Sequence, residues 1–513
     1  MYPRFGSQMM LQEPEKSTNS KNGLQHSHLP EKNFGYFVNG SKSWLICKSE
    51  EVASRAKKEF GDTVNITTEG KRHLGAVLGS ENYKDEFCKE KVDEWRKQLN
   101  NLAEIAETQP QAAHAVYTKG YRSKFTYFLR TIQDLEDYLD PVESVLFDKL
   151  VPALFGGESP DVPKELLSLN PKDGGLGIEN PKDIATNQYK ASIQKTKIHK
   201  ETIMRQEMTM RKTSSDGKTE KEIEQECRSV KTKIRTERKE MIEIPSHLKR
   251  CVEQACDTGA SNWLNAIPIK DQHLDLNKGQ FADALCIRYN QPIRNLPSKC
   301  PCGEKFDVEH ALSCKKGGFI AQRHDNLRDI LTNLLNRICK DVEAEPHMLP
   351  VTNETFKLRT ANTSQEARLD IKANGFWQRS QTAFFDIRVT HVNSSSQIQK
   401  QTAQIFRDHE NSKKREYMQR VIDVEHGVFT PLVFGTNGGM GGECQMFLKQ
   451  LATTLAENNG DSYSDIMTWI RTRLSAEILR STITCIRGSR VPFRKRDNSN
   501  EDFCLMNLEA RSR

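Results

Sequence analysis

Apolar residues recur every three to four positions in several parts of the chain, and this spacing predicts amphipathic helices. Two apolar faces lie between residues 81 and 155, and a third lies between His324 and Val342. Their members are Val92, Trp95, Leu99, Leu102 and Ile105; Phe125, Phe128, Leu129 and Ile132; and Leu327, Ile330, Leu331, Leu334 and Ile338. Helices are also expected over residues 50–60, 397–424, 443–457 and 462–482.

Shorter apolar runs that are bounded by turn residues predict strands. In the N-terminal half, a hairpin is expected over Tyr36–Cys47, with Asn39-Gly40 as its turn, and a strand over His73–Leu78. In the C-terminal half, strands are expected around Asp370 and Asp386.

These two strands are joined through Asn374-Gly375, and a buried strand is predicted over Phe429–Phe434. Because strands alternate with helices here, this half is expected to contain an α/β layer. The sequence therefore predicts a multidomain protein that combines α+β and α/β folds, with a mostly helical N-terminal half.

Two segments are polar and lack an apolar period. Residues 1–33 are rich in Ser, Asn, Lys and Gln, which predicts a disordered tail. Residues 186–250 alternate Lys and Arg with Glu, and Ser214–Gly217 interrupts them. This pattern predicts charged helices, which form either a solvated spacer or a basic face along DNA or RNA.

Composition sets broad limits on the protein. A length of 513 residues corresponds to about three domains. The net charge of +7, from 76 basic and 69 acidic residues, weakly favours a polyanionic partner. We expect no membrane-spanning helix and no secretory signal, because no sufficiently long apolar run occurs. The 13 cysteines are mostly scattered, which suits a reducing compartment better than a disulfide framework.

Three cysteines and a histidine form a compact set of potential metal ligands: Cys300, Cys302, His310 and Cys314. Zinc prefers four nitrogen or sulfur ligands in a tetrahedron. A single residue between the first two cysteines is tighter than the common spacing, and two chance cysteines near a helical histidine are the alternative. With four protein ligands, the predicted zinc ion is structural and leaves no position for a substrate.

Asp370 and Asp386 are two carboxylates on adjacent apolar runs. A hairpin would bring both to one end of a sheet, where they could hold Mg²⁺, which prefers oxygen ligands. A metal at this position would support phosphodiester hydrolysis. The alternative is a pair of structural aspartates, each in a salt bridge with Arg368 or Arg388.

Such a site needs a nearby lysine, but position 388 is arginine, a poor proton shuttle. Lys413 and Lys414 lie four and three residues before Tyr417 on the next predicted helix, so either can share a face with that tyrosine. The alternative for both lysines is a solvated helix face.

From Cys300 to about residue 490, these motifs and their order resemble the C-terminal part of site-specific non-LTR retrotransposon proteins. The Cys-Cys-His-Cys set resembles their zinc knuckle, and Arg323-His324-Asp325 resembles an Arg-His-Asn motif. The paired aspartates and the lysine-tyrosine helix resemble a restriction-like endonuclease. The resemblance implies Asp370 and Asp386 as Mg²⁺ ligands, with Lys413 or Lys414 and Tyr417 completing the site.

The N-terminal half is similar to the end of a reverse transcriptase from the same kind of protein. Tyr36–Trp44 resembles the palm after its catalytic aspartates, with Lys42 at the motif's lysine, and His73–Gly79 resembles the primer-grip hairpin. We expect no polymerase activity, because the chain has no aromatic-x-Asp-Asp turn before Tyr36. It resembles a fragment or a degenerate copy of an element.

The expected domains follow from these assignments. They are a disordered tail (1–33), a palm remnant (34–80), a helical thumb-like region (81–185), a charged helical linker (186–298), a zinc knuckle (299–322), a restriction-endonuclease-like α/β core (323–490) and a flexible basic tail (491–513).

The expected function is Mg²⁺-dependent nicking of target DNA to prime reverse transcription, in a nuclear protein that also binds retroelement RNA. Lys42, Arg323, His324 and Arg388 are the expected contacts with nucleic acid. The alternative is a catalytically inactive nucleic-acid-binding remnant.

Overall fold

A computed structural model describes residues 9–10, 42–205, 207 and 209–490. The chain divides into two compact units, one formed by the residues up to 170 together with 175–246, and the other by 171–174 together with the residues from 247 onward. The predicted linker over 186–298 is therefore divided between the two units. The predicted disordered tail (1–33) and basic tail (491–513) lie outside the described residues, apart from Met9 and Met10.

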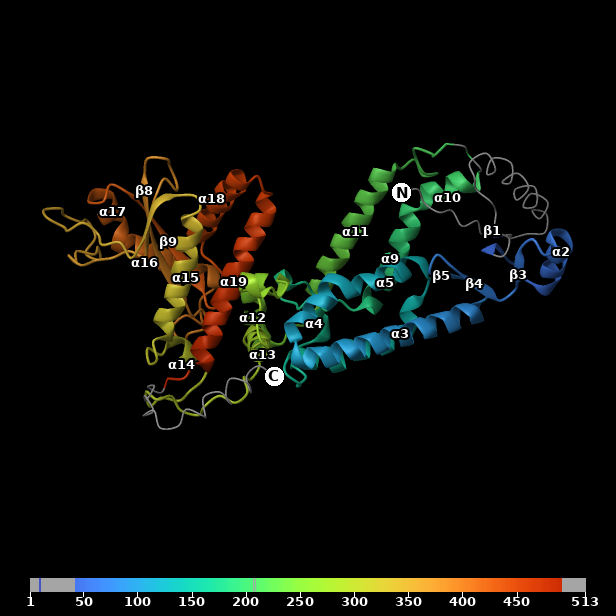
Figure 1. Ribbon diagram of the computed structural model, residues 1–513, viewed down its shortest axis with the longest axis horizontal. Helices are drawn as coiled ribbons and strands as arrows, with labels where there is room; N and C mark the ends of the chain where they lie inside the picture. Colours follow the sequence, from blue (N-terminus) through green and yellow to red (C-terminus); the bar gives the residue numbers. More distant parts are fainter. Residues whose placement is uncertain (1–8, 11–41, 206, 208, 491–513) are drawn as a thin grey trace. The chain divides into compact units, whose positions relative to one another are not determined.

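The N-terminal unit is mostly helical (Figure 1). Its helical segments are α2 (Glu50–Phe60), α3 (Glu81–Thr108), α4 (Pro110–Val116), η3 (Tyr117–Tyr121), α5 (Arg122–Thr131), η4 (Leu135–Tyr138), α6 (Asp140–Val145), η5 (Leu146–Leu150), α7 (Val151–Leu154), α8 (Lys164–Ser168), α9 (Pro181–Lys195), α10 (Lys197–Met204) and α11 (Glu220–Met241). The charged helices expected over 186–250 are thus present, with a break between Met204 and Glu220.

The predicted apolar helix faces pack in this unit's core. Trp95 of α3 makes edge-to-face contacts with Phe125 and Phe128 of α5, each with ring centroids 5.1 Å apart. Ile105 is an exception, because it is 49% exposed at the end of its face.

The strands of this unit differ from the prediction. β2 (Trp44–Ile46) lies between the parallel strands β1 (Met9–Met10) and β3 (Asn65–Thr67), so both of its edges are occupied. The first arm and the turn of the hairpin predicted over 36–47 lie outside the described residues.

The single strand predicted over His73–Leu78 is instead a hairpin of β4 (Gly70–His73) and β5 (Ala76–Gly79). Leu74 and Gly75 both have positive φ, at 48° and 90°. This is the backbone that a two-residue turn between antiparallel strands requires.

The C-terminal unit combines helices with a four-stranded sheet in the order β6-β7-β8-β9. Its strands are β6 (Lys340–Ala344), β7 (Ile371–Asn374), β8 (Thr382–Thr390) and β9 (Val428–Gly435). Its helical segments are η6 (Pro171–Asp173), α12 (Ser246–Cys256), η7 (Asn262–Asn265), η8 (Lys270–Gln272), α13 (Lys278–Arg288), α14 (Val308–Ser313), α15 (Phe319–Leu335), α16 (Thr402–Lys413), η9 (Lys414–Met418), α17 (Gln419–Asp423), α18 (Gly442–Asn459) and α19 (Tyr463–Arg487).

The predicted hairpin of β7 and β8 is confirmed, with Gly375 in the left-handed region at φ 84°. β9 runs parallel to β8, and the continuous helical segment α16–η9–α17 forms the connection between them. Parallel neighbours require such a crossover. The helix predicted from His324 to Val342 is shorter than expected, because it ends at Leu335 and β6 follows it.

Helices cover both faces of this sheet. Phe385 and Ile387 of β8 pack in the large core that includes residues of α15, α18 and α19. Phe384, which points the other way, packs against Tyr417 and Phe429. Because side chains alternate along a strand, Asp386 lies on the face covered by α16 and η9.

In the described part of the chain, no helix combines the length and the apolar character needed to cross a bilayer.

Candidate metal centre and carboxylate site

The four predicted zinc ligands are placed by a tight turn and a short helix. Gly303 has φ 101°, and its amide donates to the carbonyl of Cys300 over 2.8 Å, which closes the turn that carries Cys302. Asp307 caps α14 by accepting from the amide of His310 over 2.8 Å. His310 and Cys314 are four residues apart at the end of this helix, so their side chains share a face.

The ligand atoms of Cys300, Cys302, His310 and Cys314 all lie within 4.8 Å of one another. The sulfurs of Cys300 and Cys314 are 3.8 Å apart, and the Cys302 sulfur is 3.3 Å from Nε2 of His310. Tetrahedral zinc with Zn–S bonds near 2.3 Å separates two sulfurs by roughly 3.8 Å. The cluster can therefore hold a metal ion such as zinc.

The thiols of the cluster differ in their electrostatics, and burial raises the pKa of the Cys300 thiol. A hydrogen bond from the backbone of Glu304 lowers the pKa of the Cys302 thiol, which favours the thiolate that binds metal. Cys300 and Cys314 are buried with Phe306 against Cys485, near the end of α19. The knuckle is thus an integral part of the C-terminal unit.

The β7–β8 hairpin brings the two predicted aspartates to the same part of the sheet. Asp370 immediately precedes β7, and its amide donates to the carbonyl of Phe385 over 3.1 Å. Asp386 follows Phe385 on β8 and is only 5% exposed.

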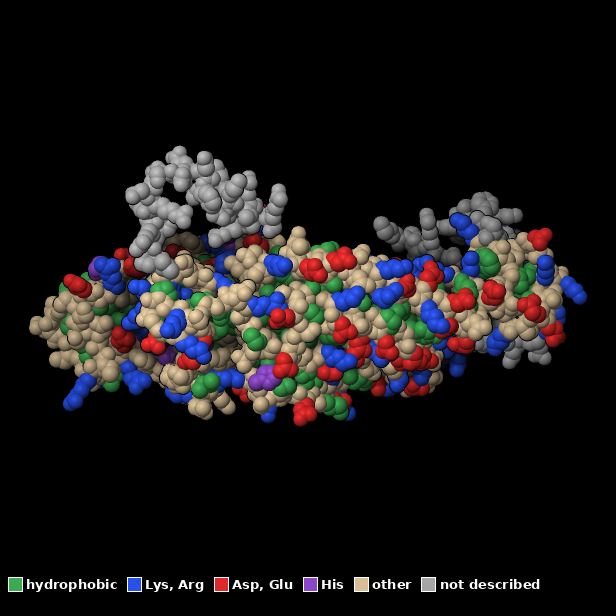
Figure 2. Space-filling model, turned by 90° about the horizontal axis from the view of Figure 1, so that it is seen from below, with side chains coloured by type: hydrophobic (Ala, Val, Ile, Leu, Met, Phe, Trp, Pro, Cys, Tyr) green, Lys and Arg blue, Asp and Glu red, His purple; other side chains and the backbone are tan. Residues whose placement is uncertain are grey.

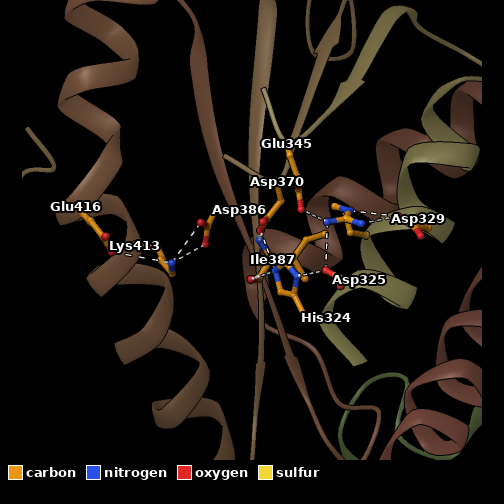
Figure 3. A network of polar contacts seen from close by, with 10 residues as sticks. His324, Asp325, Asp329, Glu345, Asp370, Asp386, Ile387, Lys413 and Glu416 are labelled. Carbon is orange, nitrogen blue, oxygen red and sulfur yellow. Dashed lines mark hydrogen bonds and ion pairs between the residues drawn. The ribbon is translucent and has the colours of Figure 1, made fainter. Parts of the chain in front are cut away.

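Asp386 faces a lysine from the helix that follows its strand. Nζ of Lys413 lies 2.9 Å from Oδ2 of Asp386 and 3.2 Å from Oδ1 (Figure 3). The Oδ2 atom is buried and accepts no hydrogen bond among the described residues, so its only partner there is the ion pair. Burial raises the pKa of Asp386 to about 6, although the charge of Lys413 opposes this shift.

Asp370 is engaged by a histidine. Its Oδ2 accepts a hydrogen bond from the amide of Ile387 and lies 3.2 Å from Nε2 of His324. The hydrogen bond with Asp370 raises the pKa of His324 to about 9, with a smaller contribution from Asp325. Figure 3 shows the Asp370 carboxylate directed toward His324 and the Asp386 carboxylate directed toward Lys413.

The two adjacent lysines have different partners. Lys414 forms an ion pair with Glu443 of α18 and not with either aspartate. Lys413 instead reaches Asp386 and lies 5.3 Å from the ring centroid of Tyr417. Tyr417 is buried, and its burial raises the pKa of its phenol far above the ordinary range. Lys413 and Tyr417 are thus placed at the carboxylate site.

The predicted contacts with nucleic acid are placed differently from one another. Arg323 is 4% exposed, with Nη1 4.0 Å from the sulfur of Cys485, so its guanidinium is not available to a ligand in this structure. His324 is directed to Asp370. Arg388 is partly exposed on the same face of β8 as Asp386, and Lys42 is exposed at the start of the N-terminal unit.

Sequence reasoning missed several charged residues around the aspartates. With the predicted residues, the network contains six carboxyl groups and four cationic side chains: Asp325, Asp329, Glu345, Asp370, Asp386 and Glu416, with His324, Arg328, Arg368 and Lys413. Glu416 could have been found, because it follows Lys413 by three positions on a helix. Glu345 could not have been found in this way, because it directly follows β6, a strand that the sequence did not predict.

On the face shown in Figure 2, the acidic and basic side chains of the described residues are interspersed, without a broad area of one sign. Any polyanionic partner on this face would therefore meet local groups of cations.

No protein-family model matches the chain, and no curated protein matches it.

Proposed function

We propose that the C-terminal unit is a restriction-like endonuclease of a non-LTR retroelement, which uses Mg²⁺ at Asp370 and Asp386 to nick DNA. The observation that carries this proposal is the ion pair between Lys413 and Asp386. It joins a carboxylate on β8 to a lysine from the following helix, beside a second carboxylate at the start of β7. Two carboxylates can hold Mg²⁺, and a lysine beside them can stabilise the charge of a phosphate during hydrolysis.

The residues present fit a divalent cation. The buried Oδ2 atom of Asp386 accepts no hydrogen bond among the described residues and has Lys413 as its ion-pair partner there, so it can still accept a metal ion. With His324 protonated, the six carboxyl groups and four cations of the network leave two negative charges in excess. When bound, Mg²⁺ would neutralise charge on the phosphate and lower the pKa of a water molecule.

The chain's own residues have distinct roles in this proposal. Lys413 opposes the effect of burial on the pKa of Asp386 and provides a positive charge for the phosphate. His324 and the amide of Ile387 fix the orientation of Asp370. The metal-binding knuckle stabilises the end of α19 and is separate from the chemistry. A nuclear site of action and retroelement RNA as a second partner follow from the same proposal.

A second candidate is a non-catalytic nucleic-acid-binding remnant of such an element. It is favoured by the fact that each aspartate already has a protein cation, Lys413 for Asp386 and His324 for Asp370. In addition, position 388, two residues after Asp386, is arginine and not lysine. Calorimetry separates the two candidates, because tight Mg²⁺ or Mn²⁺ binding that requires both aspartates supports only the nuclease.

Plasmid nicking tests the proposal directly. Purified protein with Mg²⁺ is expected to convert supercoiled plasmid to the open-circular form, and Asp386→Ala should lower the rate by about 100-fold or more. Asp408→Ala is the matched control, because Asp408 is an acidic residue of α16 that pairs with Lys400 outside the site. Equal rates for the wild type and Asp386→Ala would overturn the assignment.

A further inference from the structure

A long polar loop begins and ends beside the carboxylate site. Residues 349–366 connect β6 to β7 and contain no helix or strand. The loop closes where the amide of Met348 donates to the carbonyl of Ala367 over 3.0 Å. Asp370 follows only three residues later, so the base of the loop is continuous with the first aspartate.

A buried arginine fixes this loop to the helix that carries Lys413. Arg420 of α17 is 0% exposed. Its guanidinium donates to the carbonyl of Asn362 over 3.1 Å, to that of Ser364 over 2.8 Å and to that of Leu349 over 2.9 Å. Burying a guanidinium is unfavourable unless it is hydrogen-bonded, so these three bonds hold both arms of the loop in one conformation.

Two further contacts fix the loop to the same helical segment. The amide of Lys357 donates to Oε1 of Gln419 over 2.9 Å. The amide of Asn362 donates to the carbonyl of Glu416 over 2.8 Å, and its side-chain amide donates to the Tyr417 hydroxyl over 3.4 Å. The loop is therefore held against η9 and α17 at several points, although it lacks regular secondary structure.

The tip of the loop exposes an apolar side chain between two cations. The amide of Ala361 donates to the carbonyl of Leu358 over 3.0 Å, which makes a turn at the tip. Leu358 is 45% exposed, and Lys357 and Arg359 on either side of it are also exposed. Neither cation forms an ion pair with a residue in the described ranges, so both are available to a polyanion.

The tip is anchored to the helical segment that carries Lys413. Gln419, which holds Lys357, is six residues after Lys413, and only η9 lies between α16 and α17. One continuous helical segment therefore holds both the tip and the lysine that pairs with Asp386.

We propose that Lys357-Leu358-Arg359 is a wedge that bends duplex DNA at the cleavage site. Leu358 inserts against a base step in the minor groove, while Lys357 and Arg359 bind the flanking phosphates. Apolar wedges with adjacent cations unstack base steps in this way and kink the duplex. The inference rests on the proposed function, since it assigns duplex DNA to the same site.

The test measures DNA bending without cleavage. The full-length chain is mixed with a duplex of about 30 base pairs that carries a fluorophore at each end, in EDTA, and energy transfer and binding anisotropy are recorded. Wild type is expected to increase energy transfer. Leu358→Ala should abolish the increase while binding within about threefold of wild type. Lys357→Ala combined with Arg359→Ala should weaken binding about tenfold at low salt.

Met446→Ala is the matched control, because Met446 is an exposed apolar residue of α18 in the same unit, and it should bend DNA like wild type. Leu358→Glu, which keeps a side chain at the exposed tip, should also abolish bending. Equal bending by wild type, Leu358→Ala and Leu358→Glu would overturn the wedge. Bending is measured in EDTA and nicking is measured with Mg²⁺. A protein that bends DNA in EDTA but does not nick plasmid with Mg²⁺ would therefore contradict the proposed function and leave the wedge intact.

Discussion

At the residue scale, the structure separates two lysines that are adjacent in sequence. Successive residues of a helix point about 100° apart, so Lys413 and Lys414 cannot both reach the same carboxylate. Lys413 lies on Asp386 and Lys414 on Glu443. The sequence left both open because each is spaced from Tyr417 by about one turn.

This difference gives a sharp prediction for nicking. Lys413→Met should lower the rate by about 100-fold, because it removes the positive charge beside Asp386. Lys414→Met should stay within about threefold of wild type, and the plasmid assay with Mg²⁺ measures both. Equal losses in the two variants would mean that the ion pair with Asp386 has no part in catalysis.

Asp386 also makes stability depend on pH. Its pKa is raised from 3.8 to about 6 by burial, so the folded state prefers the neutral acid. The associated stability is fully present below about pH 4 and is lost as the pH rises through 6. Asp386→Asn should therefore stabilise the protein in EDTA at pH 8, by up to about 3 kcal/mol, and much less at pH 4.

Urea unfolding of wild type and Asp386→Asn at both pH values tests this expectation. Asp408→Asn serves as the comparison, because the ion pair with Lys400 lowers the pKa of Asp408. A difference between wild type and Asp386→Asn that is the same at pH 4 and pH 8 would contradict the raised pKa.

At the element scale, the knuckle shows how a tight spacing becomes a metal site. A single residue between Cys300 and Cys302 is acceptable because Gly303 adopts a left-handed backbone. The other two ligands are His310 of α14 and Cys314, the residue that caps the end of this helix. The knuckle then packs against α19 through Cys485 and Ile486. Loss of the metal should therefore loosen the end of α19 as well.

Metal analysis tests this element. The purified protein should contain about one zinc ion per chain, and Cys302→Ser should lower the zinc content and the Tm. Cys256→Ser is the control, because Cys256 is exposed and lies outside the cluster. An unchanged zinc content in Cys302→Ser would remove this cysteine from the site.

Other elements show why local patterns were not sufficient. The long apolar face after His324 suggested a helix to Val342, but Ile338 and Val342 pack against the core from a turn and from β6. Apolar residues that face one core look alike in a sequence whether a helix or a strand carries them.

At the scale of the whole molecule, mixed charge limits how DNA can be bound. The net charge is +7 in 513 residues, and acidic and basic side chains are interspersed on the face shown in Figure 2. A protein that makes few phosphate contacts releases few counterions. We therefore expect the logarithm of DNA affinity to fall with the logarithm of salt concentration with a slope no steeper than about −5.

Fluorescence anisotropy with a labelled duplex between 50 and 200 mM salt, in EDTA, measures this slope. Each unit of slope corresponds to about one phosphate contact. A slope near −10 would instead indicate an extended basic surface that lies outside the view in Figure 2.

The sequence by itself determined the local features of this protein. The helix over 50–60, the β7–β8 hairpin, the strand of Phe429–Phe434 and the four knuckle ligands all follow from spacing and turn chemistry, which act between near neighbours. These features were also sufficient to choose Asp370 and Asp386 as a candidate pair.

Only the tertiary structure decided which charges meet. The choice of Lys413, the burial of Arg323, the approach of His324 to Asp370 and the clamp of Arg420 on the loop depend on how the sheet faces its helices. Contacts between residues far apart in sequence leave no periodic signal, because they are set by packing across the sheet. Local sequence patterns were thus sufficient to choose candidate functional residues, whereas the residues that contact them could be identified only from the tertiary structure.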